Sequence, residues 1–566
     1  MIVYGDDLML KLERWRRSIW LRPVGSLRSW ISARPGLLRL GGASFLFAVL
    51  LTPSIWMLSV IPPLWRDVDA YAQVTLAPGP GTILHYGPLY CFVARIPLYL
   101  GYAIDCLKAG FHLPTLRFFA DPILTDSGVF ALLISQHVAL CWSTFYLITL
   151  TSRLFWVRLM LAIAWAVNPL FYTFAHTVGS ETLSMILLLL LGGVGLRIIQ
   201  GRGSSSWKGW LFFGVLLWLC ILTRHVNTAL AALLPSSLIL LGAHHLIMIP
   251  FTNSNPLAPS RWLKAKRALQ KATLAVVVGI GCIVLANASL RILCYATRIP
   301  YYSTLGFTFL FRLKFLAELS PEKRNELFDD VTKHTSSTDV KKMISLIRTG
   351  FSTETSNWDV LGFSQKARAS LFPRQLDPDG EKYHVLLNRT ALAFLSRPEK
   401  ILLSAVATDF KRSQEITIPD VVSFLFVATR YYFSHPAVMP QCASLITFRD
   451  KNAVEVFAIF KKHSYFRHPK NVDYRALLLF WLVVLALFLL IAKIRMREAA
   501  DLASYATALT VIGLLMMLAN CALTVFQPRF TLPMWELTII SVSILSGKSV
   551  EYLLAGRRQQ PNAVCQ

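Results

Sequence analysis

Charged residues, and acids above all, are scarce in this chain. Only 16% of its 566 residues are Asp, Glu, Lys or Arg, whereas soluble domains average about 25%. The 31 acids stand against 57 lysines and arginines, which gives a formal net charge of +26. A nucleic-acid-binding protein can carry such an excess, but it would not contain apolar runs of about 20 residues. The scarcity of charge and the 55% share of hydrophobic residues indicate an integral membrane protein.

Paired cysteines are also missing. The nine cysteines stand singly, without a CxxC pair or the Cys/His spacing of a zinc site. This pattern argues against a zinc or dithiol redox centre, and cysteines in apolar runs behave as small hydrophobic residues. No internal repeat, coiled-coil heptad or low-complexity tract stands out either.

The chain has instead a series of long apolar runs. A membrane-spanning helix needs about 20 such residues. Runs of this kind lie at 37–61, 128–150, 157–175, 181–199, 209–223, 226–249, 272–294, 475–493, 503–526 and 533–553. We therefore predict an all-α polytopic membrane protein with about ten transmembrane helices, the fifth of which is short.

The loops between these runs separate by charge. With the N-terminus in the cytoplasm, the basic stretches all fall inside: the N-terminal arm, "TSRLFWVR", "QGRGSSSWK", "SRWLKAKRALQK", "KIRMRE" and "GRRQQ". Cytoplasmic loops are enriched in Lys and Arg, so this orientation agrees with the positive-inside rule. We expect a bacterial inner (plasma) membrane protein whose functional face is turned to the periplasm or exterior.

The stretch between the seventh and eighth spans has a different character. It carries charges of both signs, and "SPEKRNELFDDVTKH" and "SSTDVKKMISLIRTG" predict amphipathic helices with Ser-type caps. The patch "IPDVVSFLFVATRYYF" is too short and interrupted to span, so we expect a buried or interfacial helix. The predicted parts are a cytoplasmic basic arm (1–36), a transmembrane module (37–294) with its first outer loop at 62–127, an external, mainly helical domain (295–474), C-terminal transmembrane helices (475–553) and a cytoplasmic tail (554–566).

Unusual polar residues gather on the predicted outer side. They are Asp67, Asp69, His85 and Arg95 in the first outer loop, His176 and Glu181 between spans three and four, Arg224 and His225 between spans five and six, and Arg529 between spans nine and ten. Ionisable residues near hydrocarbon are costly and by default suggest function. Their common position at one membrane surface is where a lipid headgroup would lie.

This combination of acids and bases suits glycosyl transfer from a lipid-phosphate sugar. The acceptor must be deprotonated as it attacks the anomeric carbon, and Asp67 or Asp69 provides the general base. The phosphate must be held as it leaves, and Arg224, Arg529 and His85 provide groups for that role. The remainder of the loop, "GPLYCFVARIPLYLGYAIDCLKAGFHL", is amphipathic and is expected to lie in the interface and line a lipid path.

Four short motifs, in this order, resemble the GT-C glycosyltransferases, in particular the branch of protein O-mannosyltransferases and lipid A aminoarabinose transferases. They are Asp67 and Asp69 followed by Tyr71, "HYGPLY" at 85–90, Ser180 with Glu181 after "NPLFYTFAHTV", and "QPRFTLPMWE" at 527–536. The resemblance covers about 37–294 and 475–553 and leaves out 295–474. It implies a GT-C-like bundle, a polyprenyl-phosphate-sugar donor and a glycan, lipid or protein acceptor.

The motifs also imply roles for particular residues. Alignment on the aromatic four residues downstream selects Asp67 as the catalytic acid, with Asp69 as the alternative. The substrate- and phosphate-binding set is His85, Tyr86, Glu181, Arg224 and Arg529.

Two positions depart from the branch pattern. Val68 separates the two acids, which are often adjacent in the branch, and Gly87 stands where the branch often has proline. The branch usually acts without a metal at its catalytic centre, so no cofactor is expected to be required. A divalent metal is nonetheless possible, because Asp67, Asp69 and Glu181 could supply oxygen ligands.

Other interpretations of the same residues stay open. Asp67 and Asp69 are also compatible with a solvated helix end, Glu181 with an acid favoured by the helix dipole, and Arg224 or Arg529 with a headgroup anchor. A transporter or flippase is the main alternative function, although such proteins typically carry repeats and charges at the bilayer midplane. A non-catalytic envelope scaffold that binds partners through 295–474 is a third possibility.

Overall fold

The computed structural model describes most of the chain between its terminal segments. The described residues are 35–61, 63–65, 84, 87–110, 125–201, 207–247, 258–353, 359–373, 375, 377, 380–396, 400–425, 473–495, 499–524 and 526–557. Most of the predicted arm and tail, and residues 426–472 of the predicted external domain, lie outside them. Nearly all described residues are helical, which confirms the predicted all-α class.

Most of the helices form one bundle around a large apolar core, with a smaller apolar cluster beside it. Its elements are α2 (Pro35–Val60), α4 (Pro88–Lys108), α5 (Asp126–Thr151), α6 (Phe155–Ala166), α7 (Pro169–Ala175), α8 (Ser180–Ile199), α9 (Trp207–Thr223), η2 (His225–Ala232), α10 (Leu233–Ile247), α11 (Ala258–Ala296), α21 (Tyr474–Arg495), α22 (Ala499–Leu523), η6 (Pro528–Thr531) and α23 (Leu532–Arg557). Two short strands, β1 (Leu64–Trp65) and β2 (Thr177–Val178), pair in parallel at one end of the bundle.

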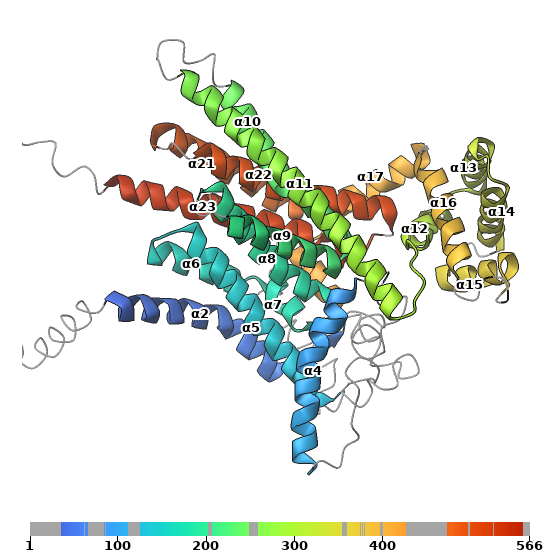
Figure 1. Ribbon diagram of the computed structural model, residues 1–566, viewed down its shortest axis with the longest axis horizontal. Helices are drawn as coiled ribbons and strands as arrows, with labels where there is room; N and C mark the ends of the chain where they lie inside the picture. Colours follow the sequence, from blue (N-terminus) through green and yellow to red (C-terminus); the bar gives the residue numbers. More distant parts are fainter. Residues whose placement is uncertain are drawn as a thin grey trace, which may run out of the picture.

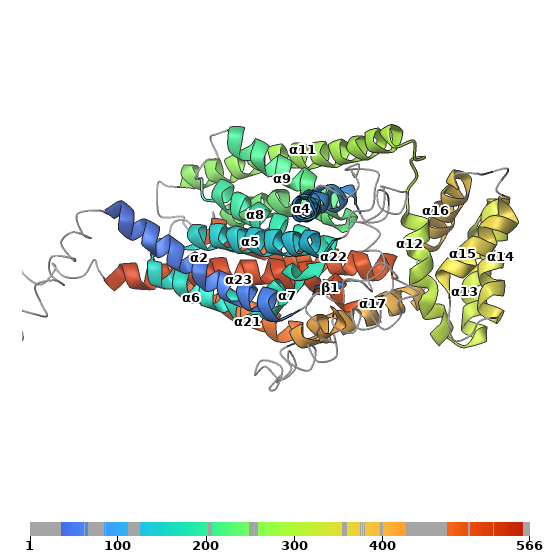
Figure 2. The same cartoon turned by 90° about the horizontal axis from the view of Figure 1, so that it is seen from below.

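The predicted spans are found as helices. Nine helices of the described chain are long and apolar enough to cross a membrane, and α6 with α7, bent by 63°, makes a tenth candidate. One of the nine, α4, runs across the others in both views (Figures 1 and 2). The shorter α9 packs along α8 and α11. The polytopic fold is therefore confirmed. The sequence placed α4 in the first outer loop, whereas its length and hydropathy make it a candidate span.

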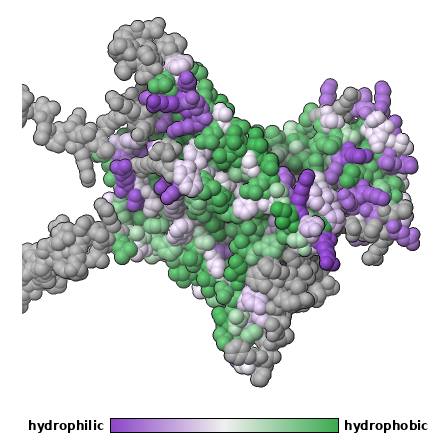
Figure 3. Space-filling model, viewed as in Figure 1, coloured by the Kyte–Doolittle hydropathy of each residue, from purple (hydrophilic) through white to green (hydrophobic). Residues whose placement is uncertain are grey.

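The outer surface of the bundle is apolar around its middle and polar towards its ends (Figure 3). On α11, for example, Val277, Ile280 and Val284 are each about 60% exposed. Soluble monomers rarely expose apolar patches of this extent, whereas lipid tails accommodate them. The chain is an integral membrane protein.

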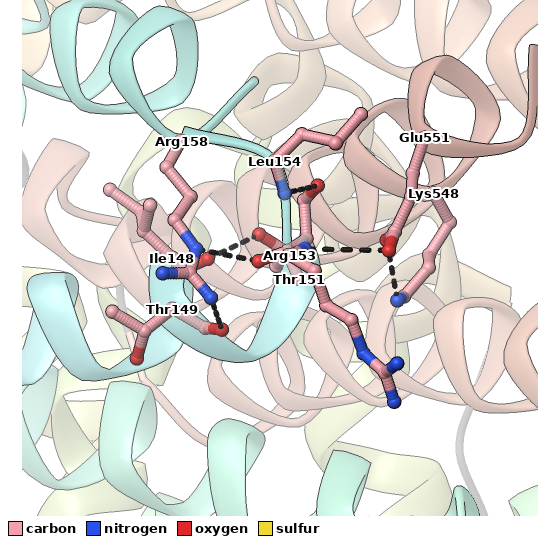
Figure 4. Close-up of polar contacts among 9 residues, drawn as sticks. Ile148, Thr149, Thr151, Arg153, Leu154, Arg158, Lys548 and Glu551 are labelled. Carbon is pink, nitrogen blue, oxygen red and sulfur yellow. Dashed lines mark hydrogen bonds and ion pairs between the residues drawn. The ribbon is translucent and has the colours of Figure 1, made fainter. Parts of the chain in front are cut away.

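The start of α2, the basic turn between α5 and α6, and the end of α23 lie at the same end of the bundle (Figures 1 and 2). There the Arg158 side chain donates to the carbonyls of Ser152 (2.6 Å) and Thr149 (3.1 Å), which belong to the last turn of α5 and its cap (Figure 4). Glu551 of α23 accepts from the Arg153 N–H (3.4 Å) and from Lys548 Nζ (2.8 Å). The Arg158 side chain thus satisfies carbonyls that the end of α5 leaves open. The backbone N–H of Arg153 and the Glu551 carboxylate join this turn to α23.

A second helical unit, here called the end domain, lies at the opposite end (Figures 1 and 2). It consists of α12 (Leu305–Arg312), η4 (Leu313–Glu318), α13 (Pro321–His334), α14 (Thr338–Thr353), α15 (Val360–Leu371), α16 (Glu381–Ser396) and α17 (Lys400–Glu415), and it has its own apolar core. Ser320 caps α13 through the Lys323 N–H (3.5 Å), and Ser337 accepts from the Val340 N–H (3.4 Å) at the start of α14, as the sequence predicts.

Polar contacts inside the end domain fix its helices. Asn388, within the sequon "NRT", accepts from the Gly306 N–H (2.7 Å) and donates to the Ser303 carbonyl (2.8 Å). The side chain that a glycan would occupy therefore already holds α12 against α16. His384 stacks on Tyr302 with ring centroids 4.0 Å apart, and burial, aided by Arg368, lowers the pKa of His384 to about 4.

The helix α17 belongs to both cores. Val406 packs against the apolar cluster of the end domain and against that of the bundle. Asp409 forms an ion pair with Arg312, whose side chain is only 1% exposed. At the end of α17, Glu415 pairs with Arg475 (3.2 Å), next to the first residue of α21. These contacts fasten the end domain to the helices α21 and α22.

Candidate active site at the end-domain face of the bundle

The chain that leaves the first span lies directly beside the chain that enters α8. In the parallel pair of strands, Leu64 is opposite Thr177 and Trp65 is opposite Val178. The Leu64 N–H also donates to the His176 carbonyl (3.1 Å). The strand that leads to the acids Asp67 and Asp69 is thereby held next to the strand that leads to Glu181.

A buried network fixes this pair of strands to α4 and α5. Gln136 donates through Nε2 to the carbonyls of Ala175 (3.0 Å) and Thr177 (3.1 Å). The Tyr90 hydroxyl donates to Gln136 Oε1 (3.1 Å) and accepts from the Gly179 N–H (3.0 Å). Because unsatisfied backbone groups are costly in a membrane, these side chains supply the partners that a break between helices needs.

The histidine predicted at this turn has a structural position. His176 is 1% exposed, and its Nε2 lies 2.9 Å from the Ile61 carbonyl. A carbonyl only accepts, so Nε2 carries the hydrogen and Nδ1 accepts from His137 Nε2 (3.2 Å). His176 therefore ties the end of the first span to α5.

Glu181 and Arg224 are the two candidate residues that the structure brings into contact. Glu181 lies in the first turn of α8 with its side chain 1% exposed, and Arg224 follows the last residue of α9 with 13% exposed. Their Oε1 and Nη1 atoms are 3.9 Å apart. The acid at a helix N-terminus and the cation at a helix C-terminus are both favoured by the helix dipoles, so two candidates from distant parts of the sequence form one ionic centre.

The segment "HYGPLY" is anchored next to this centre through Gly87 and through Leu84, the residue that precedes it. The carbonyl of Leu84 accepts a hydrogen bond from Nε2 of His225 (2.8 Å). His225 directly follows Arg224 in the chain. Gly87 has a φ of 84°, and a Cβ on it would stand 2.5 Å from the Leu222 carbonyl oxygen and 2.7 Å from that of Thr223. Proline has a φ near −65°, so neither proline nor alanine fits here. This explains the departure of Gly87 from the branch pattern.

The third candidate with a described side chain is Arg529. It lies in η6, between α22 and α23, and is 8% exposed. Its guanidinium stands over the ring of Phe530, 5.4 Å from the centroid. The η6 turn packs against α22 and α23, so Arg529 enters this end of the bundle from a different element than Glu181 and Arg224.

The remaining predicted site residues lie outside the described part of the chain. They are Asp67, Asp69, His85 and Tyr86. Among the described residues no group of three or more His, Cys, Asp or Glu side chains could hold a metal ion. Two of the three acids considered as metal ligands, Asp67 and Asp69, lie outside the described residues. The prediction about a metal is therefore not tested.

Two features of this region went unrecognised in the sequence. Gln136 and His137 appear as isolated polar residues in an apolar run, a pattern that signals an interior position but not its partners. Glu536 lies in the apolar run at 533–553 and is fully buried. An acid inside a span is itself a signal of function, and that rule would have found it.

Comparison with known proteins finds no match: no protein-family model and no curated protein matches this chain. The assignment of function therefore depends on the residues described above.

Gly87 provides a test of how the site is held. We expect Gly87→Ala to impair function and to lower stability, because the new Cβ meets two carbonyl oxygens and the φ of 84° disfavours side chains by roughly 1–2 kcal/mol. Gly281→Ala on α11 is the matched control, since a Cβ there meets nothing within 4 Å. Thermal unfolding of both purified variants, with function measured in cells, checks this. Equal behaviour of the two variants would show that the close approach of Gly87 is unimportant.

Proposed function

We propose that this protein is a membrane-embedded glycosyltransferase that moves a sugar from a polyprenyl-phosphate-linked donor to a glycan, lipid or protein acceptor on the outer face of the membrane. The observation that carries the proposal is the Glu181–Arg224 pair, 3.9 Å apart, at the point where the strand preceding Asp67 and the residues flanking His85 are anchored. Four segments far apart in the sequence are thus anchored at one end of the bundle, and two of them carry this acid and this guanidinium.

Each proposed role follows from charge and position. Asp67 is the general base that deprotonates the acceptor, and Asp69 orients the acceptor or binds sugar hydroxyls. Arg224 and Arg529 hold the donor phosphate as it leaves, with His85 and Tyr86 beside them. Glu181 sets the position of Arg224, since it is nearly inaccessible and in contact with that guanidinium. No metal or other cofactor is part of this proposal.

The crosswise helix α4 supports a lipid-linked donor. Its exposed residues Val93, Ile96, Leu100, Ile104 and Leu107 recur at helical spacing, while Tyr90, Arg95 and Leu98 are buried. A helix with one apolar exposed face that lies across the spans suits the membrane interface. A polyprenyl chain in that interface would have its phosphate near the ionic centre.

Position argues against the alternative of a transporter or flippase. Transporters bind substrate and ions near the bilayer midplane at broken helices. Glu181 and Arg224 lie instead at the first and last turns of their helices, and Arg529 precedes α23. We propose the bacterial inner membrane as the location, with this end and the end domain facing the periplasm or exterior, because the basic turn between α5 and α6 lies at the other end.

Orientation is tested with reporters. We expect alkaline phosphatase fused at Ser336, in the turn between α13 and α14, to be active, because that turn is proposed to lie outside the cytoplasm. A fusion after Gly201, at the opposite end of α8, is the control and should be inactive. The reverse pattern would place the ionic centre on the cytoplasmic side, which contradicts a reaction on the outer face of the membrane.

The general base is tested in a deletion strain by intact-lipid mass spectrometry. We expect the strain to accumulate an unused lipid-linked sugar or an unmodified acceptor, and wild type to restore the product. Asp67→Asn keeps the shape and removes the base, so turnover should fall about 10²–10⁴-fold at normal expression, and Asp69→Asn should cost less. Glu326→Gln, at an exposed position of α13, is the control. A normal lipid profile with both Asp variants would exclude this base.

The phosphate role of Arg224 is separable from its structural role. Arg224→Gln leaves Glu181 buried without this cation, so stability should fall together with activity. The double variant Glu181→Gln with Arg224→Gln removes both charges, and its thermal stability should recover. Binding of polyprenyl phosphate in nanodiscs should stay weaker than wild type by roughly 10–150-fold, the value of one charge-assisted contact. If the double variant binds polyprenyl phosphate as tightly as wild type, Arg224 is only a counter-ion for Glu181 and does not bind the phosphate.

A further inference from the structure

The first turns of α11 carry a row of exposed cations, here called the α11 cation row. Its members, Lys264, Arg267 and Lys271, recur at intervals of three and four residues, so they lie on one face of the helix. All three are exposed, and no ion pair with any of them occurs among the described residues. The sequence of α11 contains no Asp or Glu. Like charges at this spacing repel each other, so the row favours an anion from outside the helix.

The packing of α11 leaves the α11 cation row on the surface. The face that packs on the bundle consists of alanines that are 1–5% exposed: Ala265, Ala268, Ala272 and Ala275. On one flank of this face lies α10, where a Cβ on Gly242 would stand 3.3 Å from the Leu269 side chain. Small side chains allow close helix packing, and the long basic side chains between them point away from the bundle.

The row also extends past the start of the neighbouring helix α9. The Cys282 thiol donates to the Gly214 carbonyl (3.2 Å), and Trp218 Nε1 donates to Ser289 Oγ (3.2 Å), so the two helices run in the same direction. The helix α9 begins at Trp207, seven residues before Gly214, whereas α11 begins 24 residues before Cys282. At 1.5 Å per residue, α11 extends about 25 Å farther on this side. The row is therefore not covered by α9.

The surroundings of the row are those of a membrane interface. Farther along α11, Leu274 and Val277 are 45% and 61% exposed, and lipid tails accommodate such side chains. Before the row, Trp262 is 55% exposed with the Lys266 ammonium 5.3 Å from its ring centroid, and Trp is enriched at membrane interfaces. The helix α11 runs obliquely to α23 (Figure 1), so its first turns stay close to the membrane surface. Hydrophilic surface accordingly gathers over the start of α11 (Figure 3).

The chemistry of the row fits a phosphate with acyl chains attached. Lysine and arginine donate charge-assisted hydrogen bonds to phosphate oxygens. Leu263 and Leu274 lie four residues before and seven residues after Arg267, on the same helix face, and are 42% and 45% exposed. A free anion or a nucleic acid would gain nothing from these leucines, whereas acyl chains would pack on them.

We propose that the α11 cation row binds the headgroups of anionic phospholipids in the membrane leaflet that faces this end of the bundle. Clusters of Lys and Arg next to a membrane-spanning helix attract anionic lipids. The row lies beyond the start of α9, and Arg224 follows the last residue of α9, so this surface is separate from the proposed sugar-transfer centre and does not depend on it. Bound lipid stabilises the packing of α11 on α9 and α10.

Native mass spectrometry of the full-length protein in detergent measures the binding. Dioleoyl phosphatidylglycerol is the anionic probe and dioleoyl phosphatidylcholine the zwitterionic one, and because their acyl chains are the same, the difference reports on the headgroup. We expect wild type to bind phosphatidylglycerol at least about tenfold more tightly. Raising the ionic strength should remove this preference, since exposed charges are screened by salt. This readout needs no variant.

Two triple variants with the same change in net charge test the position of the surface. The row variant combines Lys264→Gln, Arg267→Gln and Lys271→Gln, and its affinity for phosphatidylglycerol should fall about fivefold for each cation removed. The matched control combines Lys323→Gln, Lys341→Gln and Lys342→Gln, which replace exposed lysines of the end domain. The control should bind this lipid like wild type. Phosphatidylglycerol should raise the thermal midpoint of wild type and control more than that of the row variant.

Three results would overturn this surface. Equal binding of the two lipids by wild type would show that the headgroup is not recognised. Undiminished binding of phosphatidylglycerol by the row variant would leave the row to water or to an acidic protein. An equal loss in the control variant would make the attraction a property of the net charge. None of these results affects the proposed glycosyl transfer, which is tested through residues at the opposite end of α9.

Discussion

The buried ion pair between Glu181 and Arg224 is the contact on which this end of the bundle depends. Glu181 is 1% exposed, so its charge is tolerated only beside a cation. The pair joins the first turn of α8 to the residue that follows α9, and these positions also suit the two helix dipoles. Gly87 packs on the last turn of α9, and β1 pairs with β2 just before α8. The ionic centre thus fixes the helix ends to which the other segments are attached.

The sequence was sufficient for those features that depend on local pattern. The ten apolar runs correspond to helices, because hydrocarbon requires about 20 apolar residues and intrasegment hydrogen bonds. Ser320 and Ser337 were predicted as caps from residue type alone, and both accept the expected N–H groups. Each of these inferences needs only neighbouring residues.

Features that depend on distant residues could not be predicted. Nothing in "HYGPLY" reveals that Gly87 lies against the carbonyls of Leu222 and Thr223, about 135 residues later. The Gln136 amide looks like a stray polar residue until the carbonyls of Ala175 and Thr177 are placed beside it. Glu181 and Arg224 were identified as separate candidates, but their contact depends on how α8 packs on α9. In each case the partner is set by tertiary packing.

The helix α17 links the end domain to the turn that carries Arg529. Arg412 stands over the ring of Phe526, 5.6 Å from its centroid, three residues before Arg529. One turn earlier Asp409 pairs with Arg312 of α12, and one turn later Glu415 pairs with Arg475. The exposed pair contributes little stability, whereas the buried Arg312 requires its partner. The position of the η6 turn is therefore set by the end domain as well as by the bundle.

Glu181 and Glu536 show two solutions to one physical problem. Both are acids within the first turns of helices at the same end, and both are almost completely buried. Glu181 has a guanidinium 3.9 Å away, whereas the Glu536 carboxyl has no hydrogen-bond partner among the described residues. The Arg224 guanidinium offsets the buried charge of Glu181. A buried carboxyl without a paired cation bears the full cost of leaving water unless it is protonated, so the two acids differ in what their burial requires of the surrounding structure.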